Sequence, residues 1–209
     1  MAYDPEEQET IDRLKGWWHE YGNTVLGALI LFVAGIAGIQ GWRWYHTSQA
    51  EQAAQLYAEV EKAVAAKDAK KVKAAAAQVM QQFSGSAFAP RAALAAARSD
   101  YEAGDMEGAK TQLRWTINNA KEDELRDVAR LRLAGVFLDE KNYAEAMKVL
   151  EGSSSAPYSA LFSDLRGDVL AAQGKTAEAK SAYQGALETM EAGNPYRGYI
   201  ELKLESLGS

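Results

Sequence analysis

The apolar run VLGALILFVAGIAGI, residues 25–39, decides the fold of the N-terminal part of this chain. It lies within 22 residues, from Tyr21 to Trp42, that carry no charged side chain. At about 1.5 Å rise per residue, a helix of this length spans roughly 33 Å, which matches a bilayer core of about 30 Å. Aromatic residues typical of membrane interfaces flank the run on both sides, namely Trp17, Trp18 and Tyr21 before it and Trp42, Trp44 and Tyr45 after it. We therefore predict a transmembrane helix over residues 21–42, in contact with the lipid bilayer, in preference to a buried core helix.

The segment before this helix, residues 1–20, is acidic. It has six acidic residues against two basic ones, Arg13 and Lys15. A cleaved signal peptide would have a basic start and a shorter apolar core, so the pattern predicts a retained single-pass anchor. Basic residues near the membrane favour the cytoplasmic side, and only Arg43 opposes Arg13 and Lys15. We expect a cytoplasmic tail over residues 1–20 and a C-terminal domain, residues 43–209, outside the cytoplasm.

Four small residues of the predicted anchor fall on one helical face. Gly27, Ala34, Gly38 and Gly41 are spaced by 7, 4 and 3 residues. Small residues on one face allow a second transmembrane helix to approach closely, which makes these four candidate partner-binding residues. The alternative is that glycine and alanine are simply frequent in such helices.

The composition narrows the possible partners. The formal charge is −6, and most of the excess negative charge lies in the acidic tail. A nucleic-acid partner would require a strongly basic surface, so we expect none. The chain has no cysteine, which excludes disulfides and thiolate chemistry. Neither histidine, His19 nor His46, stands in a metal-ligand spacing, and no phosphate-binding or nucleotide-binding motif is present. We expect no catalytic residue, no cofactor, no metal and no small-molecule substrate.

We predict that residues 43–209 are all-α. Good helix formers dominate this part of the sequence, and short polar breaks divide it into segments of helical length. Three breaks, Gly104-Asp105, Lys141-Asn142 and Gly174-Lys175, are 37 and 33 residues apart and precede similar sequences. A helical hairpin repeated about every 34 residues is the tetratricopeptide pattern. Small residues recur twelve positions apart, with a larger residue four beyond, in the sets Ala97, Ala109 and Leu113; Ala134, Ala146 and Leu150; and Gly167, Ala179 and Tyr183.

The expected architecture is therefore one transmembrane helix followed by a tetratricopeptide-like solenoid of helical hairpins. The usual tryptophan of the first repeat helix is missing in all three copies. The segments 50–66 and 70–83 fit the repeat only loosely, and residues 195–207 resemble a capping helix.

A solenoid presents an extended surface that suits a protein partner. The repeat alignment places a mixed set of side chains there, although each of them could merely be solvated. The candidates are Arg91, Leu94, Arg98, Tyr101, Val128, Leu131, Leu138, Leu161, Asp164 and Asp168.

The whole chain resembles the ancillary subunits of the bacterial Sec translocon. The resemblance rests on RLKGWWHEYG at residues 13–22, GWRWY at 41–45, ALFSDLRGD at 160–168 and Gly174-Lys175. It implies a single-pass inner-membrane protein with a periplasmic tetratricopeptide-like domain. It also implies Sec translocon subunits, a membrane-anchored periplasmic chaperone of the peptidyl-prolyl isomerase type and newly exported client proteins as partners. The family has no catalytic residues to transfer.

Three other functions stay open at this point. The chain could be an anchored regulator whose acidic tail binds a signalling protein, or a general periplasmic peptide binder in envelope assembly. An envelope enzyme with an unrecognised site is the third alternative.

Overall fold

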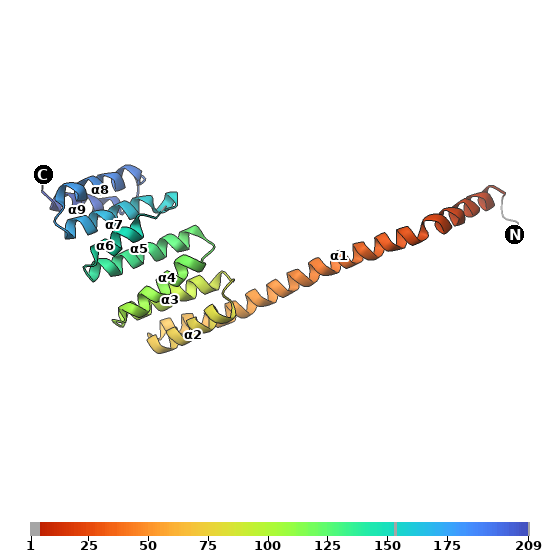
Figure 1. Cartoon of the computed structure of the whole chain (residues 1–209), viewed down its shortest axis with the longest axis horizontal. Coiled ribbons are helices and arrows are strands. Elements are labelled where there is room, and N and C mark those ends of the chain that lie inside the picture. The colour runs from red at the N-terminus through yellow and green to blue at the C-terminus, as the bar shows by residue number, and fades with distance from the viewer. Residues whose placement is uncertain (1–4, 153, 209) are drawn as a thin grey trace. The chain divides into compact units, whose positions relative to one another are not determined.

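A computed structural model of the chain describes residues 5–152 and 154–208, and every regular element in these two ranges is helical (Figure 1). The elements are α1 (Pro5–Ala65), α2 (Ala69–Gln82), α3 (Phe88–Glu102), α4 (Met106–Asn119), α5 (Asp123–Asp139), α6 (Tyr143–Leu150), the 3-10 turn η1 (Ala156–Tyr158), α7 (Ser159–Ala172), α8 (Thr176–Thr189) and α9 (Arg197–Ser206). The all-α prediction is confirmed.

The chain divides into two compact units, with the boundary between Ala50 and Glu51. The first unit consists of the N-terminal part of α1. Its large apolar side chains are exposed, as Leu31 (75%) and Phe32 (66%) illustrate. Among the described residues, α1 is the helix that is long and apolar enough to cross a membrane.

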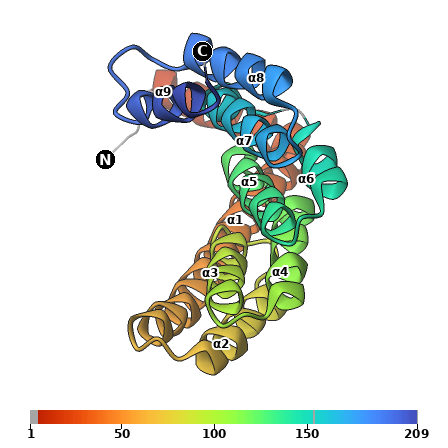
Figure 2. The same ribbon diagram turned by 90° about the vertical axis from the view of Figure 1, so that its left-hand side faces the viewer.

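The second unit, residues 51–209, is built from helical hairpins. Helices next to each other in the chain pack against each other from α2 to α9, and α5 also contacts α3 and α7. Figure 2 shows α3, α5 and α7 in one row, with α4, α6 and α8 in a second row beside it. This is the arrangement predicted for a tetratricopeptide-like solenoid.

The four hairpins found in the described residues turn in the same way. One residue of each turn has a positive φ, namely Lys67, Gly104, Lys141 and Gly174. In each turn the amide of the next residue donates to a carbonyl five positions earlier, as in the bond from Asp105 N to Asp100 O at 2.8 Å. This bond and the left-handed residue define a Schellman motif, which ends the first helix of each hairpin. The loosely fitting first pair, α2 with the end of α1, therefore belongs to the same repeat series.

The twelve-residue spacing of small residues is confirmed as a packing rule. Every member of the three predicted sets is buried. Gly167 shows why the position must stay small, because a Cβ added there would collide with the ring of Tyr183. The two helices of a hairpin therefore cross too closely for a larger side chain.

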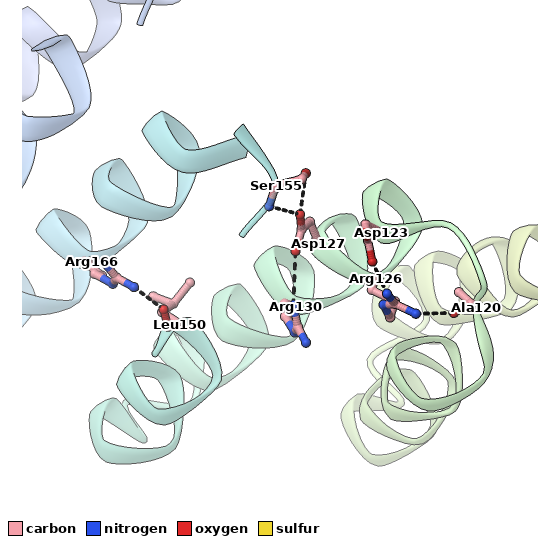
Figure 3. Close-up of polar contacts among 8 residues, drawn as sticks. All are labelled: Ala120, Asp123, Arg126, Asp127, Arg130, Leu150, Ser155 and Arg166. Carbon is pink, nitrogen blue, oxygen red and sulfur yellow. Dashed lines mark hydrogen bonds and ion pairs between the residues drawn. The ribbon is translucent and has the colours of Figure 1, made fainter. Parts of the chain in front are cut away.

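Asp127 stabilises the passage from the third hairpin to the fourth (Figure 3). It is buried, and its Oδ2 accepts bonds from Ser155 N at 2.8 Å and Ser155 Oγ at 2.7 Å. Arg130 Nη1 donates to its Oδ1 at 3.2 Å, and Arg166 donates to the Leu150 carbonyl. Ser155 is thereby held against α5, and the end of α6 against α7.

Candidate partner-binding surfaces

The small-residue face of α1 is open. A Cβ placed on Gly27, Gly38 or Gly41 would meet no atom within 4 Å, and Ala34 is exposed. These four residues thus form a face that nothing in the described part of this unit covers. Their role in binding a second helix stays a prediction.

The second unit carries a groove along α3, which we call the α3–α5 groove. It consists of two hollows of about 670 and 420 Å3 that share Arg98, Glu102 and Arg132. The larger hollow lies between the end of α1, α2 and α3, and the smaller between α3, α4 and α5. Four predicted partner-binding residues line the groove, namely Arg91, Leu94, Arg98 and Tyr101.

Most charges of the groove have a partner on the same helix or on a neighbouring one. Arg91 Nη2 lies 2.9 Å from Glu122 Oε2, and Tyr101 Oη donates to Asp139 Oδ2 at 2.7 Å. Arg98 Nε donates to Glu102 Oε1 at 2.7 Å, and this bond raises the pKa of Arg98.

Lys67, in the turn before α2, and Arg132 on α5 are the exceptions. Within residues 5–152 and 154–208, neither has an acidic side chain within ion-pair distance. Of the two, Arg132 lines both hollows. Desolvation by the groove walls lowers its pKa, and the nearby Arg98 guanidinium lowers it further. The groove therefore presents a positive charge that the described chain does not neutralise.

The predicted residues of α5 have a different environment. Val128, Leu131 and Leu138 are half-buried and pack against the central core formed by α3 to α7. The groove is lined instead by Arg132, Gly135 and Asp139. Leu161 on α7 is also half-buried, against the C-terminal core. Binding of a partner by these four leucine and valine side chains stays a prediction.

Asp164 and Asp168 are engaged within the chain, where they attach the capping helix α9. Lys203 Nζ lies 2.9 Å from Asp164 Oδ1 and 2.8 Å from Asp168 Oδ2. Tyr196 Oη donates to Asp164 at 3.0 Å, and Tyr183 Oη to Asp168 at 2.8 Å. Burial raises the pKa of Asp164, and the Lys203 ammonium opposes that rise. The predicted capping helix therefore closes the last hairpin through a charged contact that no local sequence pattern predicts.

Comparison with known proteins agrees with this architecture. A family model described as a tetratricopeptide repeat-like domain matches residues 15–209. The ancillary SecYEG translocon subunit of Neisseria gonorrhoeae (strain ATCC 700825 / FA 1090) is 32% identical over 99% of this chain and 100% of its own length. The ancillary SecYEG translocon subunit of Haemophilus influenzae (strain ATCC 51907 / DSM 11121 / KW20 / Rd) is 30% identical over 90% of this chain and 92% of its own length.

A solved structure, the MamA RS-1 ArsTM double mutant, has a similar fold. It superposes with a TM-score of 0.54 at 16% identity and covers 74% of this chain and 86% of its own. The sequence similarity runs through both the apolar helix and the hairpin repeats. The chain belongs to the family of ancillary SecYEG translocon subunits, with a tetratricopeptide repeat-like domain.

Proposed function

We propose that the chain is a non-enzymatic, membrane-anchored scaffold for protein–protein interaction that associates with the Sec translocon. The observation that carries this proposal is the similarity to ancillary SecYEG translocon subunits over 99% of the chain, so that anchor and solenoid are both included. Helical solenoids provide extended binding surfaces, which suits a subunit that assists a larger assembly.

The proposed topology places residues 1–20 in the cytoplasm, 21–42 across the bacterial inner membrane and 43–209 in the periplasm. Its support is the position of Arg13 and Lys15 before the apolar run, against Arg43 alone after it. An alkaline phosphatase fused after Ser209 should be active, since that enzyme folds only outside the cytoplasm. An inactive fusion that is present at normal amounts would reverse the topology.

Two surfaces are available for the partners. The open face at Gly38 is suited to a helix of the translocon, and the α3–α5 groove to the peptidyl-prolyl isomerase-type chaperone or to exported client proteins. In lipid, two helices gain little from burying apolar surface, so close approach at small residues supplies the attraction.

Affinity purification of the full chain in mild detergent tests the proposal. We expect translocon subunits to co-purify. Gly38→Leu should reduce their amount, because its larger side chain holds a neighbouring helix away, whereas Ile36→Leu, which nearly conserves volume, should not. Recovery of a soluble cytoplasmic protein without translocon subunits would favour the anchored regulator instead.

A further inference from the structure

The α3–α5 groove combines an apolar floor with a basic rim. Leu94, Leu113 and Val136 contribute apolar surface to its two hollows. The four basic residues that line it are Lys67, Arg91, Arg98 and Arg132, and the two acidic ones are Glu102 and Asp139. The groove is therefore locally basic in a chain whose formal charge is −6.

Neither carboxylate of the groove lies within ion-pair distance of Arg132. Glu102 accepts a hydrogen bond from Arg98, and Asp139 accepts one from Tyr101. Across the described ranges, Arg132 has no ion pair although it faces the groove from α5. An arginine that lines a groove and is left without a counter-charge is a favourable place for an incoming anion.

Arg98 and Arg132 line both hollows, so an anion bound where the hollows meet lies near both guanidiniums. Their mutual repulsion, which also lowers the pKa of Arg132, would be relieved by a carboxylate placed near them. A planar carboxylate matches the guanidinium fork, and such charge-assisted bonds are stronger than neutral ones.

From this geometry we propose that the α3–α5 groove binds an extended peptide segment in which carboxylates alternate with apolar side chains, with Arg132 as the main charge contact. The carboxylates meet Arg132 and Arg98, and the apolar side chains cover the floor at Leu94 and Val136. This inference rests on the proposed scaffold function and specifies the chemistry of the partner.

The test uses the purified full chain in detergent micelles and a fluorescently labelled ten-residue peptide of alternating Glu and Leu. A peptide with Gln in place of Glu is the neutral probe. By fluorescence anisotropy, we expect the acidic peptide to bind at least about tenfold more tightly than the neutral one, as one charge-assisted contact would give. Arg132→Gln should remove most of this difference without changing the melting temperature, because the arginine has no ion pair to lose.

Arg114→Gln is the matched control, since Arg114 is an exposed arginine on α4 outside the groove. It should leave peptide binding unchanged. Arg98→Gln should weaken binding less than Arg132→Gln, because Arg98 is already paired with Glu102. Arg132→Glu should reverse the preference, so that a peptide of alternating Lys and Leu binds better than the acidic one. A purely structural role of Arg132 would not produce that reversal.

Three results would overturn the proposal. The first is equal binding of acidic and neutral peptides, or acidic-peptide binding that survives Arg132→Gln. The second is Arg132-dependent binding to phosphatidylcholine vesicles containing phosphatidylglycerol that the acidic peptide does not compete away, which would assign the groove to lipid headgroups. The third is Arg132-dependent self-association, which would assign it to a second copy. None of these needs the translocon, so co-purification of translocon subunits would still test the scaffold function separately.

Discussion

The same residue types have opposite environments in the two units of this molecule, exposed in the first and closely packed in the second. Phe32 in the first unit is 66% exposed, whereas Phe162 in the second is 1% exposed. Gly38 would meet nothing if it gained a Cβ, whereas Gly167 would collide with Tyr183. The solenoid buries its apolar surface within itself, and the apolar part of α1 leaves its own surface uncovered.

This difference shows that the two units need different surroundings. A helix satisfies its backbone hydrogen bonds internally, so α1 can expose apolar side chains to lipid without an unpaired polar group. The solenoid instead gains stability by removing alanine and larger apolar side chains from water. The same substitution should therefore have different effects in the two units.

The largest contrast is expected between the two phenylalanines. Phe162→Ala should lower the free energy of unfolding of the solenoid by about 3–5 kcal/mol, because it leaves a cavity in the central core. Phe32→Ala should leave that value unchanged. Thermal unfolding of the full chain in micelles, followed by circular dichroism, measures both. A similar loss in the two variants would contradict the division into units.

A charge in the middle of the apolar run should affect the first unit alone. Leu31→Arg is expected to make membrane insertion less favourable by about 3–4 kcal/mol, because an arginine replaces a favourable leucine near the centre of the helix. The fraction of the chain recovered with membranes after carbonate extraction should fall. Leu202→Arg, at an exposed leucine of α9, is the control and should remain in the membrane fraction. If both variants stayed fully membrane-bound, α1 would not be the anchor.

The two glycines provide a smaller contrast. Gly167→Ala should destabilise the solenoid by about 1–3 kcal/mol, because the ring of Tyr183 must move and its hydroxyl is bonded to Asp168. Gly38→Ala should have no effect on the melting temperature. An unchanged melting temperature for Gly167→Ala would refute the close helix crossing.

Acid should weaken the solenoid slightly through its helix caps. Hydrogen bonds from Lys73 and the Gly108 amide hold the pKa of Asp105 below its usual value. A carboxylate with a lowered folded-state pKa contributes stability above its unfolded pKa of about 4 and loses it as pH falls further. Asp105→Asn does not titrate, so the melting temperature of this variant should decline less below pH 4 than that of the unmodified chain. Equal declines of the two melting temperatures would show that protonation of Asp105 is not coupled to unfolding.

Much of the fold could be predicted from the sequence because the relevant signals are local. The uncharged run predicted the apolar helix, and the breaks at residues 104, 141 and 174 predicted the hairpin turns. The fourth turn, at Lys67, has the same form as the predicted turn at Lys141, because in both a lysine replaces the glycine or asparagine typical of a left-handed residue. The continuity of α1 beyond residue 42 follows from the lack of any breaker before Ala65.

The candidate surface was only partly predictable, because its environment depends on contacts between distant residues. Asp164 and Lys203 are 39 positions apart, so no local pattern reveals that they pair. On α5, the sequence pointed to Leu131 and Leu138, whereas the adjacent Arg132 and Asp139 line the groove. A helical period counted from Val128 leads to residues 132, 135 and 139, and this signal could have identified Arg132.

We propose that the anchor lies beside translocon helices while the solenoid of the same chain lies in the periplasm. A photo-crosslinking amino acid at position 38, and in a second variant at position 101, tests this placement directly in intact bacteria. We expect crosslinks from position 38 to integral membrane subunits of the translocon, and from position 101 to proteins with periplasmic domains. Crosslinks from position 101 to soluble cytoplasmic proteins, with no translocon subunit at either position, would contradict it.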